Sequence, residues 1–122
     1  MLEKSEIAYI ATTRPNGDPH LMPIWFVYHG GKIYFESDDS TVKSHNIQKR
    51  NRAVLCFGGK ETLIIEGSLK WGYEKQMKVP FRKLLWQKYP KEMDDSFITE
   101  KTLIFEVIPE RELSWHYAPT WD

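Results

Sequence analysis

Residues able to bind an anion cluster in the stretch SDDSTVK, residues 37–43. Ser37 stands at the end of an alternating, strand-like stretch, and Ser40 and Thr41 open what we expect to be a short helix. Lys43 follows within its first turn. A helix N-terminus presents free amides and the positive end of the helix dipole. With hydroxyl donors and one lysine beside it, this stretch predicts a cradle for a phosphate.

The same residues also allow an interpretation without a ligand. Ser40 or Asp39 can serve as the N-cap of the helix, and Lys43 can be a solvated lysine on its surface. Asp38 and Asp39 weigh against an anion site unless they act only as caps or point away. The residues by themselves leave both interpretations open.

The composition limits the classes of protein to which the chain can belong. Its 122 residues predict one domain, residues 1–122. Lysine plus arginine equals aspartate plus glutamate at 17 each, so no net charge attracts nucleic acid or an anionic membrane. Basic stretches at residues 43–52 and 78–88 are interpreted as solvated faces. We therefore expect no nucleic-acid partner and no membrane partner.

The cysteine and histidine content limits disulfides and metal sites, and the first residues indicate the cellular compartment. Cys56 is the only cysteine, so an intrachain disulfide is excluded. The four histidines contain no close ligand pair, and no metal site is predicted. Residues 1–15 carry charges where a signal peptide has its apolar core, and no apolar run reaches the length of a membrane span. These features predict a cytoplasmic protein.

The elements that would position the anion site follow from alternation and turn residues. Strands are expected at residues 6–14, 19–29, 32–37, 53–57, 62–72 and 101–117, the last interrupted at Pro109. A short helix is expected at residues 40–50, and a helical insertion at 73–95 in which Pro80 starts a new turn. The predicted fold class is mainly β: a six-stranded antiparallel barrel, closed or split, with a few short helices.

The expected strand at residues 19–29 is apolar on both faces. Its two faces are Met22, Ile24, Phe26 and Tyr28, and Leu21, Pro23, Trp25 and Val27. A strand with one wet face would alternate, so this strand is expected to be covered twice, by the barrel interior and by a subunit interface. Pro23 places the strand at an edge or a bulge.

Two segments carry a family resemblance. Residues 11–37, ATTRPNGDPHLMPIWFVYHGGKIYFES, are followed at residues 43–57 by K-x-x-N-I-x-x-x-x-R-A-V-L-C-F. Their order and spacing resemble the flavin-binding split-barrel family related to pyridoxamine 5′-phosphate oxidase. The match runs from residue 5 to residue 71 and resumes near VIPERELSW, residues 107–115.

The resemblance implies a homodimeric six-stranded split barrel with FMN at the dimer interface. It implies that the backbone of Pro23, Ile24 and Trp25 faces the flavin ring. It implies that Ser37, Thr41 and Lys43 bind the phosphate, with Ser40 as a neighbouring candidate. Trp115 resembles the aromatic residue near the C-terminus that lies beside the flavin of the partner subunit.

Departures from the oxidase pattern narrow the implied function. Met22 and Val27 replace an arginine and a lysine, and the C-terminal WHYAPTWD lacks the Arg-x-His that grips the oxidase substrate. The chain therefore resembles the flavin- or deazaflavin-dependent reductase branch. The implied function is an FMN-binding oxidoreductase that transfers a hydride or two electrons to a small-molecule substrate, with no catalytic side chain predicted.

Three other functions stay open at this stage. One is an F420-dependent reductase on the same barrel, with Lys49, Arg50 and Arg52 available for the anionic tail of that cofactor. Another is a non-catalytic flavin-binding or electron-transfer protein. The last is an interaction barrel without a cofactor.

Overall fold

The computed structural model describes residues 2, 6–58 and 61–116, with the last two of these described in their backbone only. Seven strands, two α-helices and a 3₁₀ turn make up the described part. They are β1 (Ala8–Thr13), β2 (Pro19–Ile24), β3 (Val27–His29), β4 (Lys32–Asp38), α1 (Val42–Lys49), β5 (Ala53–Phe57), β6 (Glu61–Tyr73), α2 (Phe81–Lys88), η1 (Asp95–Phe97) and β7 (Thr102–His116).

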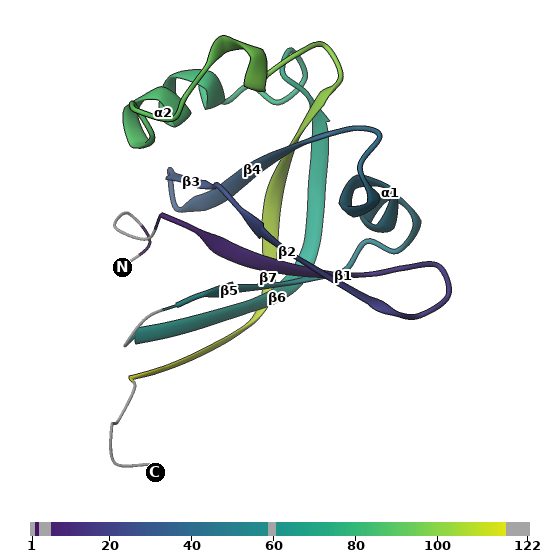
Figure 1. The fold of residues 1–122 in the computed structure, drawn as a ribbon. Coiled ribbons are helices and arrows are strands. Elements are labelled where there is room, and N and C mark those ends of the chain that lie inside the picture. Colours follow the sequence, from purple (N-terminus) through teal and green to yellow (C-terminus); the bar gives the residue numbers. More distant parts are fainter. Residues whose placement is uncertain (1, 3–5, 59–60, 117–122) are drawn as a thin grey trace.

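The strands form one antiparallel sheet in the order β2-β1-β5-β6-β7-β4-β3. Since β2 and β3 follow each other in the chain yet stand at opposite edges, the sheet must curl until its two edges approach (Figure 1). This arrangement is a split β-barrel, as the sequence predicts, with seven strands in place of six.

The extra strand comes from the expected strand at residues 19–29, which is wrong as a single element. The chain leaves the sheet at Trp25 and Phe26, so that β2 pairs with β1 while β3 pairs with β4. Pro23 lies in β2, at an edge of the sheet, as predicted. An edge strand tolerates proline because one side of it needs no ladder hydrogen bonds.

The barrel interior is filled by side chains from alternate positions of the strands. Ile10 and Leu55 are cross-strand partners and are each 1% exposed. Four buried phenylalanines interlock in pairs: the rings of Phe26 and Phe57 meet edge to face at 4.9 Å, and Phe35 and Phe105 stack at 5.0 Å. Burying one such ring contributes about 1.5–3 kcal/mol, so these pairs are a major part of the core.

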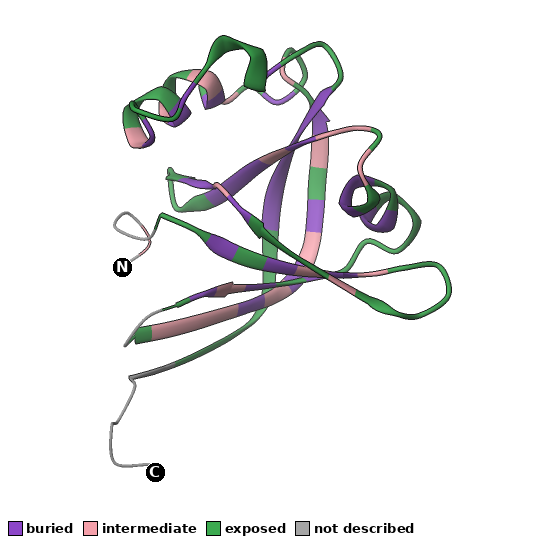
Figure 2. Ribbon diagram, viewed as in Figure 1, coloured by how far each residue is buried: buried purple, intermediate pink, exposed green. Residues whose placement is uncertain are grey.

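On the opposite face of β2, β1 and β5 many positions are exposed or half-buried (Figure 2). The strand register places two rows of residues side by side across this face. One row contains Pro23, Tyr9, Cys56, Ile64 and Leu113, and the next contains Leu21, Ala11 and Val54 and continues on β6 and β7 with Glu66 and Arg111. Leu21 is 66% exposed and Tyr9 48%. The predicted second cover of the 19–29 strand is therefore not supplied by the chain itself.

The long strands β6 and β7 bend at a β-bulge. Their register shifts between Glu66 and Gly67, opposite Pro109 and Arg111. A Cβ atom on Gly67 would collide with the carbonyl oxygen of Ile108, so the bulge requires glycine at this position. The predicted interruption at Pro109 is thus a bulge inside one continuous strand rather than the end of a strand.

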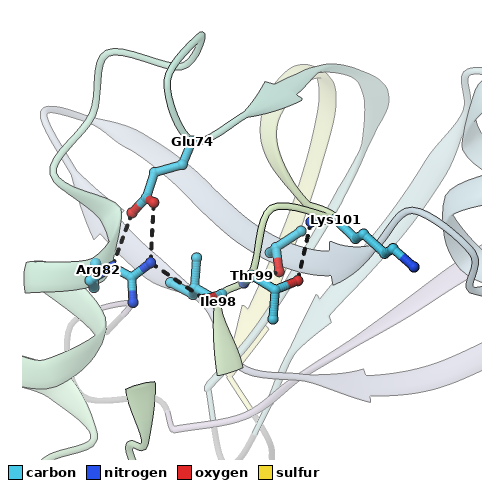
Figure 3. Close-up of polar contacts among 6 residues, drawn as sticks. Glu74, Arg82, Ile98, Thr99 and Lys101 are labelled. Carbon is cyan, nitrogen blue, oxygen red and sulfur yellow. Dashed lines mark hydrogen bonds and ion pairs between the residues drawn. The ribbon is translucent and has the colours of Figure 1, made fainter. Parts of the chain in front are cut away.

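A second layer covers the other side of β4 and β7. Helix α2 begins directly after Pro80, as predicted, but residues 74–80 form turns rather than helix. The buried side chains of this layer are Val27, Tyr34, Met77, Phe81, Leu85, Tyr89, Met93, Ile98 and Ile104. Arg82 ties the layer together, donating to both carboxylate oxygens of Glu74 at 3.2 Å and to the carbonyl oxygen of Ile98 at 3.4 Å (Figure 3).

Within the described ranges, no helix has both the length and the apolar character needed to cross a membrane. Both α-helices have eight residues. Helix α1 packs against β1 and β4 beside the β1–β2 hairpin (Figure 1). This placement brings the predicted anion site to the end of the barrel.

Candidate functional site

The first turn of α1 is capped by Thr41, not by Ser40 or Asp39. Thr41 Oγ1 accepts a hydrogen bond from the Ser44 amide at 3.2 Å. Ser40 is held by the preceding turn, where its amide and hydroxyl both donate to Asp38 Oδ1, at 2.9 and 2.6 Å. These two hydrogen bonds lower the pKa of the Asp38 carboxyl. Asp38 therefore acts on the turn and leaves Thr41 as the cap.

Three hydroxyl groups gather at this helix start. Ser37 Oγ lies 2.7 Å from Thr41 Oγ1, which lies 2.9 Å from Ser44 Oγ. Ser44 in turn donates to the carbonyl oxygen of Asp38 at 2.7 Å. Ser37 is 4% exposed and Ser44 is fully buried. Ser37 and Thr41, both predicted site residues, are thus in contact, and Ser44 joins them. Ser44 could have been found in the sequence because it follows Thr41 by three residues, the spacing at which an N-cap side chain reaches the helix.

Lys43 is buried, with 8% of its surface exposed, which excludes the solvated lysine of the ligand-free interpretation. Burial lowers the pKa of its ammonium group, and the negative charge of Glu36 partly opposes this effect. Removing an ammonium group from water is costly unless an anion compensates it. The first turn of α1 therefore contains a buried lysine, and two of the three clustered hydroxyl groups, those of Thr41 and Ser44, belong to the start of the same helix.

Two further titratable side chains, Glu36 and His20, interact electrostatically with Lys43. The sequence analysis did not identify Glu36 as a site residue. Glu36, on β4, is partly buried, and burial raises the pKa of its carboxyl while Lys43 lowers it. The second, His20, lies on β2, where it pairs with Thr12 of β1. Its Nδ1 is buried without a hydrogen-bond partner. Burial, then Arg14 and Lys43, lower the pKa of its imidazole.

Lys43 stands on α1, which packs against β1 and β4, and its charge lowers the pKa of His20 on β2 and of Glu36 on β4. The strands β2 and β4 are not hydrogen-bonded to each other. A histidine whose Nδ1 has no hydrogen-bond partner, a buried lysine and a group of hydroxyls are residue types that suit an oxygen-rich anion.

The predicted ring contacts lie at the far end of β2. Pro23 is exposed and Ile24 is 6% exposed. The indole of Trp25 stacks on Tyr89 with the ring centroids 4.5 Å apart, and its other contact is the edge of Phe97 at 5.5 Å. The side chain of Trp25 therefore packs on the α2 layer, and a ring contact by Pro23, Ile24 and Trp25 would come from the backbone, as the resemblance implies.

The last predicted contact, Trp115, is described only in its backbone. It lies in β7 opposite Thr62. Its side chain is outside the described residues, so its contact with a partner's cofactor stays a prediction.

A groove of about 810 Å³ separates α1 from the β1–β2 turn. It is lined by Arg14, Pro15, Asn16, Val42, His45, Asn46, Gln48 and Lys49. This lining includes two cations and no carboxylate, so the groove suits an anionic group. Arg52, considered above for an anionic tail, instead pairs with Glu110. Among the described residues, no group of three His, Cys, Asp or Glu side chains could hold a metal ion.

A curled antiparallel sheet that is open between its edge strands β2 and β3 and is flanked at one end by α1 defines a split β-barrel. The model of the pyridoxamine 5′-phosphate oxidase family matches residues 1–116. The chain belongs to this family. No curated protein matches it.

Solved structures share the fold at low sequence identity. A conserved hypothetical protein of Mycobacterium tuberculosis superposes with a TM-score of 0.82 at 21% identity, covering 93% of this chain and 79% of that one. An F420 reductase gives 0.77 at 19%, covering 92% of both chains. A pyridoxamine 5′-phosphate oxidase-related, FMN-binding protein from Nostoc punctiforme gives 0.68 at 19%, covering 91% and 74%. At these identities the likeness concerns the fold.

Proposed function

We propose that this protein binds FMN and transfers a hydride or two electrons to a small-molecule substrate. The observation that carries the proposal is the burial of Lys43 in the first turn of α1, the turn that Thr41 caps and that also contains Ser44. A phosphate with about −1.5 to −2 charges would compensate the buried ammonium and accept a hydrogen bond from Ser37 or Thr41, while Ser44 keeps its bond to the carbonyl oxygen of Asp38. An FMN-binding protein with the same fold supports this choice of ligand.

The chain's own residues would bind and orient the cofactor. Thr41 and Lys43 would hold the phosphate, and His20 could turn its free Nδ1 toward it. The backbone from residue 23 to residue 25 would meet the ring, with donors only from Ile24 and Trp25, since proline has no amide hydrogen. When bound, FMN would supply the hydride chemistry. We assign no catalytic side chain.

A second candidate is an F420-dependent reductase, because of one specific observation. The groove beside α1 has Arg14 and Lys49 in its lining and adjoins the same helix as the hydroxyl cluster. A longer anionic cofactor could extend from the cluster into this groove, and an F420 reductase shares the fold. The two candidates are separated by affinity: the FMN proposal requires tighter binding of FMN than of F420. A pure electron-transfer protein would bind flavin but show no turnover with a nicotinamide donor and an acceptor.

We also propose a homodimer built on the open apolar face of β2, β1 and β5. Adjacent rows of exposed and half-buried apolar side chains across several strands are unusual for a surface that stays in water. Pro23 belongs to one of these rows and also to the predicted ring contacts. A second copy seated on this face would thus reach the cofactor, in agreement with the interface position that the resemblance implies.

The direct test of the proposal is a titration of FMN fluorescence with the purified protein. Saturable quenching, absent with bovine albumin as a control, is the expected result. Failure to quench FMN at any accessible protein concentration would rule the proposal out.

Glu36→Gln is expected to strengthen FMN binding at neutral pH, by roughly two- to fivefold, because the carboxylate repels the phosphate and competes for Lys43. The raised pKa of Glu36 means that it takes up its proton at higher pH than an ordinary carboxyl. The advantage of the glutamine variant should therefore shrink as the pH falls and Glu36 becomes neutral. Titrations from neutral to acidic pH measure this ratio. A constant ratio over that range contradicts the assignment.

A further inference from the structure

The end of α2 meets the chain where β2 breaks off and β3 begins. We propose that Tyr89 is a positioning residue for the flavin ring: it fixes the backbone around Trp25 and Phe26, and through it the peptide groups that would contact the ring. This inference rests on the proposed FMN site. None of the cofactor contacts implied by the resemblance lies in the α2 segment. The proposal gives this segment a role.

The hydroxyl of Tyr89 lies among three backbone groups of the break. It accepts from the Phe26 amide at 3.2 Å, and its single proton can reach Glu6 O at 2.7 Å or Phe26 O at 3.1 Å. Lys88 Nζ already donates to Phe26 O at 2.9 Å, which favours Glu6 as the acceptor of the tyrosine proton. Both backbone groups of Phe26 are thus satisfied by side chains near the end of α2.

Ring contacts hold the same two residues from opposite sides. The indole of Trp25 lies parallel to the Tyr89 ring, with 8° between the planes. The Phe26 side chain points the other way, into the barrel, where it meets Phe57. Lys88 Nζ lies 3.5 Å from the centre of the Phe26 ring. The break therefore has one defined conformation, in which the directions of its peptide groups are fixed.

Tyr89 follows α2 directly, and this helix and the turns beside it, called the platform below, are fixed by their own contacts. Phe81 and Leu85 of α2 are each 1% exposed, and Arg82 bridges Glu74 and the carbonyl oxygen of Ile98 (Figure 3). Because the backbone at a strand break lacks the neighbouring strand that normally holds it, its position depends on this platform. Binding through peptide groups requires positions accurate to about 0.5 Å.

The test uses two ligands that differ only in the phosphate, FMN and riboflavin, and the variant Tyr89→Phe, which removes the hydroxyl and keeps the ring. We expect Tyr89→Phe to weaken binding of both ligands by a similar factor, roughly 3- to 10-fold, since the loss concerns the shared ring. The matched control is Tyr34→Phe, which removes a hydroxyl from the same buried cluster, bonded to Glu106 on β7. This control should bind both ligands as the wild type does.

The outcomes separate the two proposals. If the wild type binds both ligands and Tyr89→Phe is unchanged, or loses affinity for FMN alone, the positioning role is overturned while the FMN site stands. If the wild type binds neither ligand, the proposed function itself fails. Circular dichroism checks folding. Should Tyr89→Phe not fold, Lys88→Met, which removes the donor to Phe26 O, is expected to weaken both ligands likewise, and unchanged binding there also overturns the role.

Discussion

Lys43→Ala is expected to weaken FMN binding by roughly 10- to 100-fold and to leave riboflavin binding within about twofold. Hydrogen bonds to charged groups contribute about 1.5–3 kcal/mol, which corresponds to such a factor in affinity. Lys43 is buried in the first turn of α1, and burial places it where water screens its charge weakly. Riboflavin lacks the phosphate, so its affinity should not depend on Lys43.

Fluorescence titration with the two ligands measures this effect. The control is Lys49→Ala, which removes the same charge from an exposed position of the same helix and should change FMN affinity little. Two results would contradict the assignment: unchanged FMN affinity in Lys43→Ala, or an equal loss for both ligands.

Leu21→Lys is expected to convert a dimer into a monomer and to weaken FMN binding at least 10-fold. Leu21 is 66% exposed and stands in the apolar face of the sheet next to Val54 and Ala11. A charge buried in an apolar interface has no partner and remains desolvated, so the association is lost. The cofactor affinity falls with it because Pro23, in the adjacent row, is both a face residue and a predicted ring contact.

Light scattering coupled to size-exclusion chromatography gives the mass of each species. The control is Trp86→Lys, a charge placed at an exposed apolar residue of α2, away from the proposed interface. It should stay dimeric and bind FMN normally. A wild type that elutes as a monomer at micromolar concentration, or a Leu21→Lys protein that remains a dimer, would contradict the proposed interface.

Local signals in the sequence predict much of this fold. Alternating apolar residues and a glycine-rich turn predict the β5–β6 hairpin. The pair Gly30 and Gly31 predicts the turn between β3 and β4, and both glycines have a positive φ there. The break at Trp25 and Phe26 has no such signal. A run that is apolar on both faces looks like one strand, and only pairing with distant β1 and β4 divides it.

The candidate site shows the same limit. Ser37 and Thr41 are close in sequence, so a strand followed by a helix was enough to predict that they meet. The N-cap was wrong because neighbouring hydroxyls are locally equivalent, and the choice depends on Asp38 binding Ser40. Tyr89 could not be predicted, since its partner Phe26 is 63 residues away and α2 must first dock on the barrel.

The measurement that tests the central claim most directly is a visible absorption spectrum of the purified protein, followed by mass spectrometry of whatever heat denaturation releases. We predict a yellow protein that releases FMN. Release of F420 would select the second candidate. A colourless protein that binds neither added FMN nor added F420 would contradict the account and leave a split barrel whose buried lysine serves another purpose.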